Sequence, residues 1–153
     1  MIIRPATAAD LDAIDAIEQH SFKTPWPRST FEGELTREWA RLDVGLLDDR
    51  IIAFCNYWVV APDIQVLAIA THPDFRGRGL GRQMLDHVLA ASAAAGCQMA
   101  SLEVRASNAP AIALYEHAGF KTVHVRGRYY QDDGEDALVM MRGLGVTEPF
   151  PRP

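Results

Sequence analysis

The segment Arg76-Gly77-Arg78-Gly79-Leu80-Gly81 has the composition of a loop that binds phosphate. Glycine lets the backbone approach a ligand and turn its N–H groups toward it. A helix that starts at Leu80 adds the positive end of its dipole, and Arg76, Arg78 and Arg82 can add charge-assisted contacts. The segment predicts a site for a phosphate or pyrophosphate. The alternative is a flexible loop with a solvated basic face.

Two common phosphate-binding motifs do not fit this loop. A dinucleotide fingerprint that starts at Gly77 requires glycine at its sixth position, where Arg82 stands. A Walker A loop requires Gly-Lys followed by serine or threonine, and no lysine directly follows these glycines. The spacing therefore excludes both motifs.

Two side chains that can transfer protons follow the loop in the chain. Glu103 stands near the end of a strand predicted over Met99–Val104, and apolar neighbours raise the pKa of a carboxyl group, which suits a general base. Tyr115 lies on a helix seven residues after its cap, where its phenol can protonate a leaving group. A surface glutamate on an alternating strand and a core tyrosine with a satisfied hydroxyl are the structural alternatives.

The helices that must position these groups have clear signals. Asn108 is the expected N-cap of the later helix, with Pro110 in its first turn and Gly119 just past its end. The helix that follows the glycine-rich loop and ends at Gly96 carries apolar residues at helical spacing, namely Leu80, Met84, Leu85, Val88 and Leu89. Both helices are therefore expected to pack one face on a core.

Two helices are also predicted near the start of the chain. Thr7 can cap the first, whose apolar residues at helical spacing are Leu11, Ile14, Ile17 and Phe22. Pro25-Trp26-Pro27 then breaks the helix, because proline restricts both itself and its predecessor. Ser29 is the predicted cap of a short second helix that reaches Leu35.

The mixture of helices and strands predicts an α+β domain with a largely antiparallel sheet, in which the central strand–helix–strand part pairs in parallel. The predicted strands cover Met1–Arg4, Leu42–Leu47, Ile51–Val60, Val66–Thr71, Met99–Val104, Phe120–Val125 and Ala137–Met141. We expect one domain over residues 1–142 and a poorly ordered tail over residues 143–153, which is rich in proline and glycine.

The composition is that of a globular domain. The chain has 153 residues, of which 48% are hydrophobic and 23% charged. It can therefore bury a hydrophobic core without disulfides or metal ions to stabilise it, and it is not disordered as a whole. Its net charge of −5 argues against a surface that binds polyanions throughout. We expect a monomer that does not bind nucleic acid directly.

Neither a metal site nor a disulfide framework is predicted. Cys55 and Cys97 are far apart in apolar surroundings and form no CxxC or Cys/His cluster, so buried reduced thiols are expected. No apolar run approaches the ~20 residues that span a bilayer, and the first residues show no signal pattern. We expect a cytoplasmic protein that is not bound to a membrane.

Two of these segments, in this order and at this distance, resemble the GNAT acetyltransferase family. Arg76–Gly81 is similar to the family's phosphate-binding pattern Gln/Arg-x-x-Gly-x-Gly/Ala. Residues 108–120 are similar to its later element Asn-x-x-Ala-x-x-Leu-Tyr-x-x-x-Gly-Phe. The resemblance extends from Ile2 to about Arg142. It implies α/β/α layers and a twisted, mostly antiparallel mixed sheet whose two central parallel strands splay to hold acetyl-CoA.

Within the family, four features resemble the RimI group of ribosomal-protein alanine N-acetyltransferases. They are Ala16–Gln19 leading into Thr24-Pro25-Trp26, the run Leu102–Asn108, the run Ala111–Glu116, and Arg128-Tyr129-Tyr130 followed by Glu135-Asp136-Ala137. The resemblance implies an enzyme that acetylates the N-terminal alanine of a small-subunit ribosomal protein, with acetyl-CoA as donor and no metal.

The same resemblance implies a role for each candidate residue. The backbone of Ile69, Ala70 and Thr71 would bind the pantetheine arm and the acetyl carbonyl. Cofactor contacts are also expected from Arg76, Gly77, Arg78, Gly79, Leu80, Gly81, Arg82 and Asn108. Glu103 would be the base, directly or through water, and Tyr115 the acid for the thiolate. Trp26, Tyr129 and Tyr130 would border the peptide groove.

The sequence departs from the family pattern at two places. Ala68-Ile69-Ala70-Thr71 stands where relatives often show a polar residue followed by Ile-Ala-Val, which matters little if the backbone does the binding. Gln65 stands where several relatives carry an acidic residue, which weakens the case for a second carboxylate in the groove.

Amine acidity favours an N-terminal acceptor over lysine. An α-amine with a pKa near ~8 costs about 1.4 kcal/mol to deprotonate at pH 7, and a lysine amine near ~10.4 costs about 4.6 kcal/mol. A single glutamate base suits the α-amine better. Two alternatives remain open: a GNAT enzyme for lysines or small-molecule amines, and a non-catalytic module that binds acetyl-CoA and regulates a partner.

Overall fold

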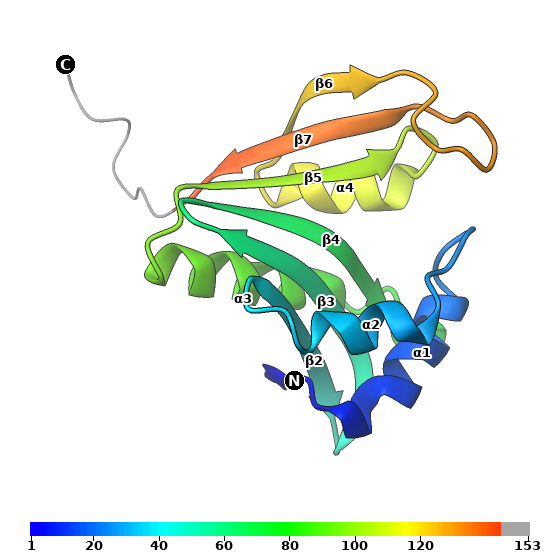
Figure 1. Cartoon of the computed structure of the whole chain (residues 1–153), viewed down its shortest axis with the longest axis vertical. Coiled ribbons are helices and arrows are strands. Elements are labelled where there is room, and N and C mark those ends of the chain that lie inside the picture. Colours follow the sequence, from blue (N-terminus) through cyan, green and yellow to red (C-terminus); the bar gives the residue numbers. More distant parts are fainter. Residues whose placement is uncertain (145–153) are drawn as a thin grey trace. The chain divides into compact units, whose positions relative to one another are not determined.

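The computed structural model describes residues 1–144, and the predicted tail from residue 145 lies outside the described part (Figure 1). Within residues 1–144 the α-helices are α1 Leu11–Gln19, α2 Arg28–Glu34, α3 Leu80–Ala94 and α4 Ala109–His117. Short 3-10 turns cover Ala8–Asp10 and Pro73–Phe75. The strands are β1 Ile2–Pro5, β2 Ala40–Leu47, β3 Arg50–Val60, β4 Asp63–Thr71, β5 Met99–Arg105, β6 Lys121–Arg126 and β7 Ala137–Gly143.

The strands of this described part form a mixed sheet in the order β1-β2-β3-β4-β5-β7-β6. The pairs β1–β2, β2–β3, β5–β7 and β6–β7 are antiparallel, and β4 and β5 are parallel neighbours. The strand–helix–strand connection through α3 makes this parallel pair possible, because parallel strands need a long crossover. The predicted α+β class with a mostly antiparallel sheet is confirmed.

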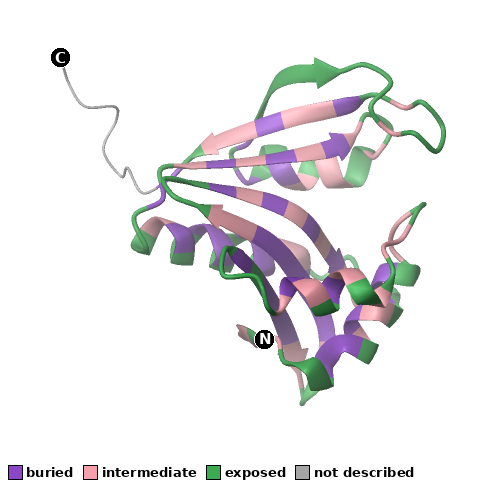
Figure 2. Ribbon diagram, in the orientation of Figure 1, coloured by how far each residue is buried: buried purple, intermediate pink, exposed green. Residues whose placement is uncertain are grey.

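The chain divides into two compact units, each with its own contacts. The first contains residues 1–58 and 66–87, and the second contains residues 59–65 and the rest of the described chain, residues 88–144. In the first unit, apolar residues of α1 and α2 pack on β2, β3 and β4, whose buried residues are purple in Figure 2. This core consists of Leu11, Ile14, Ile17, Phe31, Leu42, Val44, Phe54, Ala68 and Ala70.

The core of the second unit depends on the alternation of β5. Ala100, Leu102 and Val104 are buried on one face of the strand, while the residues between them are only partly covered (Figure 2). Buried residues of α4, the turn after it and β7 belong to the same unit, namely Tyr115, Ala118, Phe120 and Met140, and Met140 pairs with Leu102. Strand β6 is exposed along its whole length, so it contributes pairing to β7 and little core.

Helix starts near the N-terminus differ in detail from the prediction. The N–H and hydroxyl of Thr7 both donate to Asp10 Oδ2, so Thr7 begins the 3-10 turn that leads into α1. The predicted cap at Ser29 is wrong, because α2 already begins at Arg28 with Pro27 in the cap position. Phe22 lies beyond the end of α1 but still packs against the first core.

The last strand runs slightly further than predicted. β7 ends at Gly143, and the N–H of the buried Leu144 donates to the carbonyl of Gln98 at 2.8 Å. These two residues therefore belong to the folded part rather than to the tail. The two cysteines are free thiols and both are buried, as expected.

A buried acid–phenol pair joins β2 to β3 in the first unit. The Tyr57 hydroxyl donates to Asp43 Oδ2 at 3.1 Å, and both residues are more than nine-tenths buried. Burial raises the pKa of Asp43, while the hydrogen bond from Tyr57 and the charges of His87 and Arg41 oppose that rise. Removing the Tyr57 hydroxyl would leave the ionised carboxylate of Asp43 without its donor.

We expect Tyr57→Phe to lower the free energy of unfolding by about 1–3 kcal/mol at neutral pH, because a buried charged acceptor loses its partner. The pKa of Asp43 is raised in the folded state, so the stability that this group contributes is present at low pH and is lost as pH rises through the folded pKa. Without the Tyr57 hydroxyl, which opposes this rise, the pKa of Asp43 is higher still and more stability is lost as pH rises. The difference in the free energy of unfolding between variant and wild type should therefore grow from acidic to neutral pH. Urea denaturation at several pH values measures it.

The control for this prediction is the same substitution in an Asp43→Asn background. An amide does not ionise in this range, so the cost of Tyr57→Phe should there be independent of pH. An equal pH dependence in both backgrounds would contradict the assignment.

Candidate functional site

The glycine-rich loop has the backbone that its sequence indicates. Gly77 and Gly79 both have a φ of +77°, a conformation that side chains rarely adopt. A Cβ built at either residue meets no atom within 4 Å, so backbone conformation rather than crowding requires glycine here. The loop is exposed from Arg76 to Gly79. It leaves open space on its surface for a ligand that contacts the backbone.

Helix α3 begins directly after the second of these glycines. The N–H of Gln83 donates to the carbonyl of Gly79 at 3.1 Å, which starts the helical ladder. The N–H groups of Leu80, Gly81 and Arg82 precede this bond and have no helical acceptor. A helix start with free N–H groups and a positive dipole end favours an anion such as a phosphate group.

The three arginines of the loop already have partners within the first unit. Arg76 Nε donates to the Thr71 carbonyl at 3.0 Å, and its Nη2 donates to Ser21 Oγ at 3.0 Å. Arg78 lies over the ring of Phe75, 5.0 Å from its centroid, and Arg82 pairs with Asp86 at 2.9 Å. Arg76 thus joins the loop to the end of α1 in addition to its predicted role toward phosphate.

The end of β4 leads into this loop. Ile69 and Thr71 are partly exposed and alternate with the buried Ala70, so their face of the strand is the accessible one. The N–H of His72 donates to the Ile52 carbonyl at 2.7 Å, which holds the strand end against β3. Backbone binding by residues 69–71 stays a prediction.

Glu103 stands on the partly covered face of β5, opposite Val139 of β7. Its Oε1 lies 3.6 Å from Arg126 Nε, and 20% of its side chain is exposed. Its other oxygen, Oε2, is buried and has no hydrogen-bond partner among residues 1–144. A buried carboxylate oxygen without a donor is costly, so this atom is available to accept a proton or a hydrogen bond.

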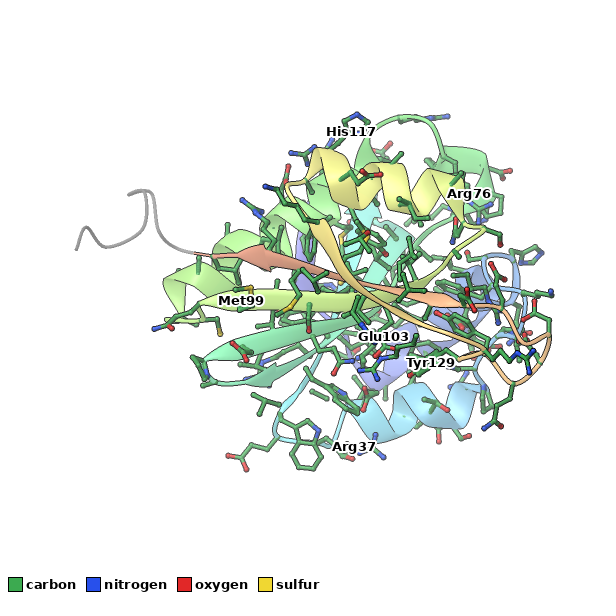
Figure 3. The ribbon with its side chains drawn as sticks, turned by 90° about the horizontal axis from the view of Figure 1, so that it is seen from above. Arg37, Arg76, Met99, Glu103, His117 and Tyr129 are labelled. Carbon is green, nitrogen blue, oxygen red and sulfur yellow. The ribbon has the colours of Figure 1, made fainter. Side chains whose placement is uncertain are left out.

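The two tyrosines after β6 have different surroundings. Tyr129, which Figure 3 labels together with Glu103, is 46% exposed. Its hydroxyl interacts with the Glu103 carboxylate. This hydrogen-bonding interaction raises the pKa of Tyr129, partial burial adds to the rise and Arg126 opposes it. Tyr130 is half-buried beneath the guanidinium of Arg105. Tyr129 is therefore the more accessible of the two.

Asn108 and Tyr115 belong to the segment that follows β5. Asn108 Oδ1 accepts a hydrogen bond from the N–H of Ala111 at 3.3 Å, which confirms the predicted cap of α4. Tyr115 is 8% exposed, and its ring packs edge-on against Phe120 at 5.9 Å. The structure thus groups Glu103, Asn108, Tyr115, Tyr129 and Tyr130 in the second unit.

Trp26 belongs to the first unit, together with the glycine-rich loop. Its N–H group in the backbone donates to Glu18 Oε2 at 2.9 Å, and its ring lies 5.8 Å from that of Phe31. Glu18 is 2% exposed, and burial raises its pKa. Trp26 is partly covered by the first core, so one part of its ring packs inside and the rest is accessible.

Comparison with known proteins identifies the family. Residues 11–120 match the model of the acetyltransferase (GNAT) family. The chain belongs to the GNAT family. It is an acetyltransferase, as the resemblance implied.

Several relatives of this GNAT protein match it over most of their own length. It is 40% identical over 136 residues, 88% of this chain and 91% of the relative, to the ribosomal protein bS18-alanine N-acetyltransferase of Salmonella typhimurium. The crystal structure of the ribosomal-protein-S18-alanine N-acetyltransferase from Escherichia coli covers 99% of both chains with a TM-score of 0.88 and 33% identity. The structure of Ard1 from Thermoplasma volcanium, at 23% identity, a TM-score of 0.85 and coverage of 94% and 97%, shows the shared fold.

Two arginines near the candidate residues of this GNAT domain were not predicted as site residues from the sequence. Arg126 contacts Glu103 and lies over the ring of Tyr129, 5.8 Å from its centroid. Arg105 contacts Tyr130 and several carboxylates. Strand alternation places Arg105 on the face of Glu103, a signal in the sequence, whereas nothing local indicates Arg126.

Residues 1–144 contain neither a candidate membrane-spanning helix nor a candidate metal-binding cluster. None of the helices described there is both long and apolar enough to cross a membrane. No group of three or more histidine, cysteine, aspartate or glutamate side chains in this range could hold a metal ion.

We expect Glu103→Gln to lower the pKa of Tyr129 toward the ordinary value of a phenol. The carboxylate is the main cause of the raised value, and the amide carries no charge. Titration of the ultraviolet absorbance of ionised tyrosine, compared with the same titration of Tyr129→Phe variants, isolates this group. An unchanged Tyr129 titration in Glu103→Gln would show that the two side chains do not interact.

Proposed function

We propose that this protein transfers the acetyl group of acetyl-CoA to the N-terminal alanine of a small-subunit ribosomal protein. The observation that carries the proposal is the 40% identity, over 88% of this chain, to an enzyme named for that activity on bS18. The 33% identical Escherichia coli structure that covers 99% of both chains supports it. The predicted monomeric state and cytoplasmic location accompany this proposal and stay predictions.

The first unit carries the residues proposed to hold acetyl-CoA. Bound there, acetyl-CoA supplies an activated thioester for acyl transfer. The N–H groups of residues 80–82 and the open backbone at Gly77 and Gly79 suit its pyrophosphate. Arg78 and Arg82 would add charge, because their present contacts are exposed and weak compared with a phosphate pair. The backbone of Ile69, Ala70 and Thr71 is proposed to bind the pantetheine arm, and Asn108 to contact it from the start of α4.

The second unit carries the proposed proton transfers. Glu103 removes a proton from the α-ammonium group of the acceptor, so that the neutral amine can attack the carbonyl carbon of the thioester. The unpartnered Oε2 of Glu103 supports this role, since it can accept a proton without breaking an existing hydrogen bond. As the carbon–sulfur bond breaks, Tyr115 gives its proton to the departing sulfur. Trp26, Tyr129 and Tyr130 are proposed to line the path of the acceptor peptide.

The acceptor is tested by competition between two peptides in the presence of acetyl-CoA. One peptide has a free N-terminal alanine followed by basic residues, and the other has a blocked N-terminus and an internal lysine. We expect CoA release and an acetyl group, located by mass spectrometry, with the first peptide only. Turnover on the lysine peptide would overturn the acceptor and keep the family. Binding of acetyl-CoA without turnover on either would favour a small-molecule acceptor or a non-catalytic role.

The two proton-transfer roles are tested by Glu103→Gln and Tyr115→Phe. We expect each variant to reduce kcat by about 10²–10⁴-fold, the usual contribution of a general acid or base. The control is Glu116→Gln, an exposed residue next to Tyr115 that should keep wild-type kcat. Wild-type kcat in both Glu103→Gln and Tyr115→Phe would refute the assignment, and thermal unfolding of each variant checks that the fold is intact.

A further inference from the structure

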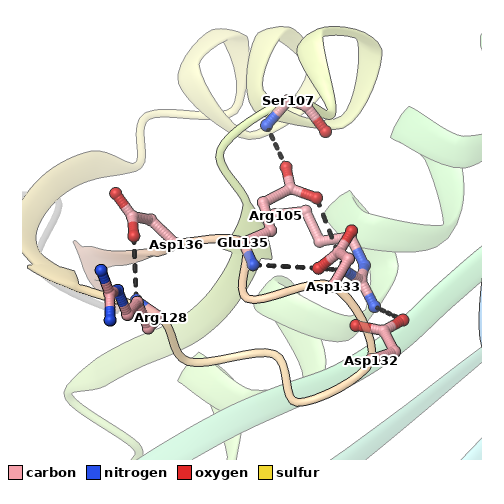
Figure 4. A network of polar contacts seen from close by, with 7 residues as sticks. All are labelled: Arg105, Ser107, Arg128, Asp132, Asp133, Glu135 and Asp136. Carbon is pink, nitrogen blue, oxygen red and sulfur yellow. Dashed lines mark hydrogen bonds and ion pairs between the residues drawn. The ribbon is translucent and has the colours of Figure 1, made fainter.

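Arg105 lies on β5 two residues after Glu103, on the same partly covered face of the strand. Its guanidinium contacts three carboxylates of the turn between β6 and β7, as Figure 4 shows. Nη2 lies 2.7 Å from Asp132 Oδ2, and Nη1 lies 3.2 Å from Asp133 Oδ1 and 3.4 Å from Glu135 Oε2. We call these four residues the Arg105 network.

The same guanidinium covers one of the two neighbouring tyrosines. Arg105 Cζ lies 4.0 Å from the centroid of the Tyr130 ring, and only 19% of the Arg105 side chain is exposed. Tyr130 in turn packs edge-on against Tyr129, with ring centroids 5.2 Å apart. The Tyr130 ring therefore contacts both Arg105 of the network and Tyr129, the exposed tyrosine beside Glu103.

A second set of bonds ties the turn to the chain after β5. Glu135 Oε1 accepts a hydrogen bond from the Ser107 N–H at 2.7 Å, and the Ala106 N–H donates to the Asp136 carbonyl at 3.0 Å. Ser107 directly precedes Asn108, the cap of α4. Within the turn, the Tyr130 N–H donates to the Glu135 carbonyl at 3.1 Å. Glu135 thus joins the turn to both Arg105 and the start of the helix that carries Tyr115.

The chemistry of this network requires arginine. Asp132, Asp133 and Glu135 are close in the chain, and their like charges repel unless a cation lies among them. A guanidinium offers several donors in a fixed plane and stacks on an aromatic ring at the same time. A lysine ammonium keeps the charge but can match neither the set of three carboxylates nor the stacking on Tyr130.

We propose that Arg105 is a positioning residue, which binds the β6–β7 turn to the end of β5 and thereby holds Tyr129 beside Glu103. Arg105 acts through Tyr130 and Glu135 and does not itself touch the reacting groups. The inference rests on the proposed function, in which Glu103 is the base and Tyr129 borders the acceptor. The proposal gives the two tyrosines different roles: Tyr130 fixes the turn, and Tyr129 faces the substrate.

The test is Arg105→Lys, with three readouts on the full chain. Hydrogen exchange of amides in residues 127–136 should become faster. The pKa of Tyr129, which faces Glu103 on β5, Arg126 on β6 and the ring of Tyr130, should fall toward its ordinary value. With the free-alanine peptide, kcat should fall about tenfold or more, because small displacements of reacting groups are costly, while KM for acetyl-CoA stays within about twofold.

The matched control is Arg37→Lys, the same change at an arginine that pairs with the buried Glu34 in the first unit. It should leave all three readouts as in wild type. Glu135→Gln is the second variant, because its amide oxygen can still accept from Ser107 while its charge toward Arg105 is lost. We expect it to move the readouts in the same direction by a smaller amount, with thermal unfolding close to wild type.

Failure of this proposal differs from failure of the proposed function. If Arg105→Lys leaves the exchange of residues 127–136 and the Tyr129 titration unchanged, the positioning role is wrong whatever the acceptor is. A faster exchange with unchanged kcat would also overturn it. If wild type does not acetylate the free-alanine peptide, the proposed function fails, and the exchange and titration readouts still decide whether Arg105 holds the turn.

Discussion

Alternation along β5 is the constraint on which the candidate catalytic part of the second unit depends. Successive side chains of a strand point to opposite faces, so Leu102 and Val104 enter the core while Glu103 and Arg105 share the other face. The antiparallel register with β7 fixes this face, since Glu103 pairs with Val139 and Arg105 with Ala137. A slip of one residue would bury both charged groups in the core and is therefore strongly disfavoured.

The charged groups on that face have contrasting environments. Arg105 is surrounded by carboxylates and a ring, so its bonds are satisfied and its geometry is fixed. Glu103 has a distant contact with Arg126 and one oxygen without a donor. Proteins normally satisfy buried polar atoms, and the exceptions occur where an atom has a task other than stability. On one face of β5, a satisfied network thus lies two residues from an unsatisfied group that the proposed reaction uses.

The proposed cofactor loop of the first unit depends on backbone geometry, whereas the proposed proton transfers of the second unit depend on side chains. Positive φ values at Gly77 and Gly79 turn the chain into α3 and leave N–H groups at the helix start without acceptors. Arg76 joins this loop to Ser21 and the end of α1. The segment that carries Trp26 is in turn bonded to Glu18 of α1. The proposed cofactor loop and the Trp26 segment are therefore connected to the same helix.

Much of the fold could be predicted from the sequence, because local patterns carry it. The apolar spacing of α3, the Asn108 cap with Gly119 past the helix end, and the alternation of β5 all appear in the structure at the expected places. The predicted Ser29 cap failed because Pro27, with its fixed φ, takes the cap position two residues earlier. The glycine-rich loop and its helix start could likewise be predicted, since the backbone conformation there depends on Gly77 and Gly79 themselves.

Periodicity, capping and motif spacing within short segments were enough to predict most of the elements, the resemblance to the family and the candidate residues Glu103, Asn108 and Tyr115. The partners of these residues, by contrast, depend on the tertiary structure. Arg126 and Tyr129 reach Glu103 through the pairing of β5, β7 and β6, and Arg105 meets a turn that lies 27–30 residues further along the chain. Contacts at such separation depend on which strands pair and on the conformation of the turn between them, and alternation within a single strand specifies neither.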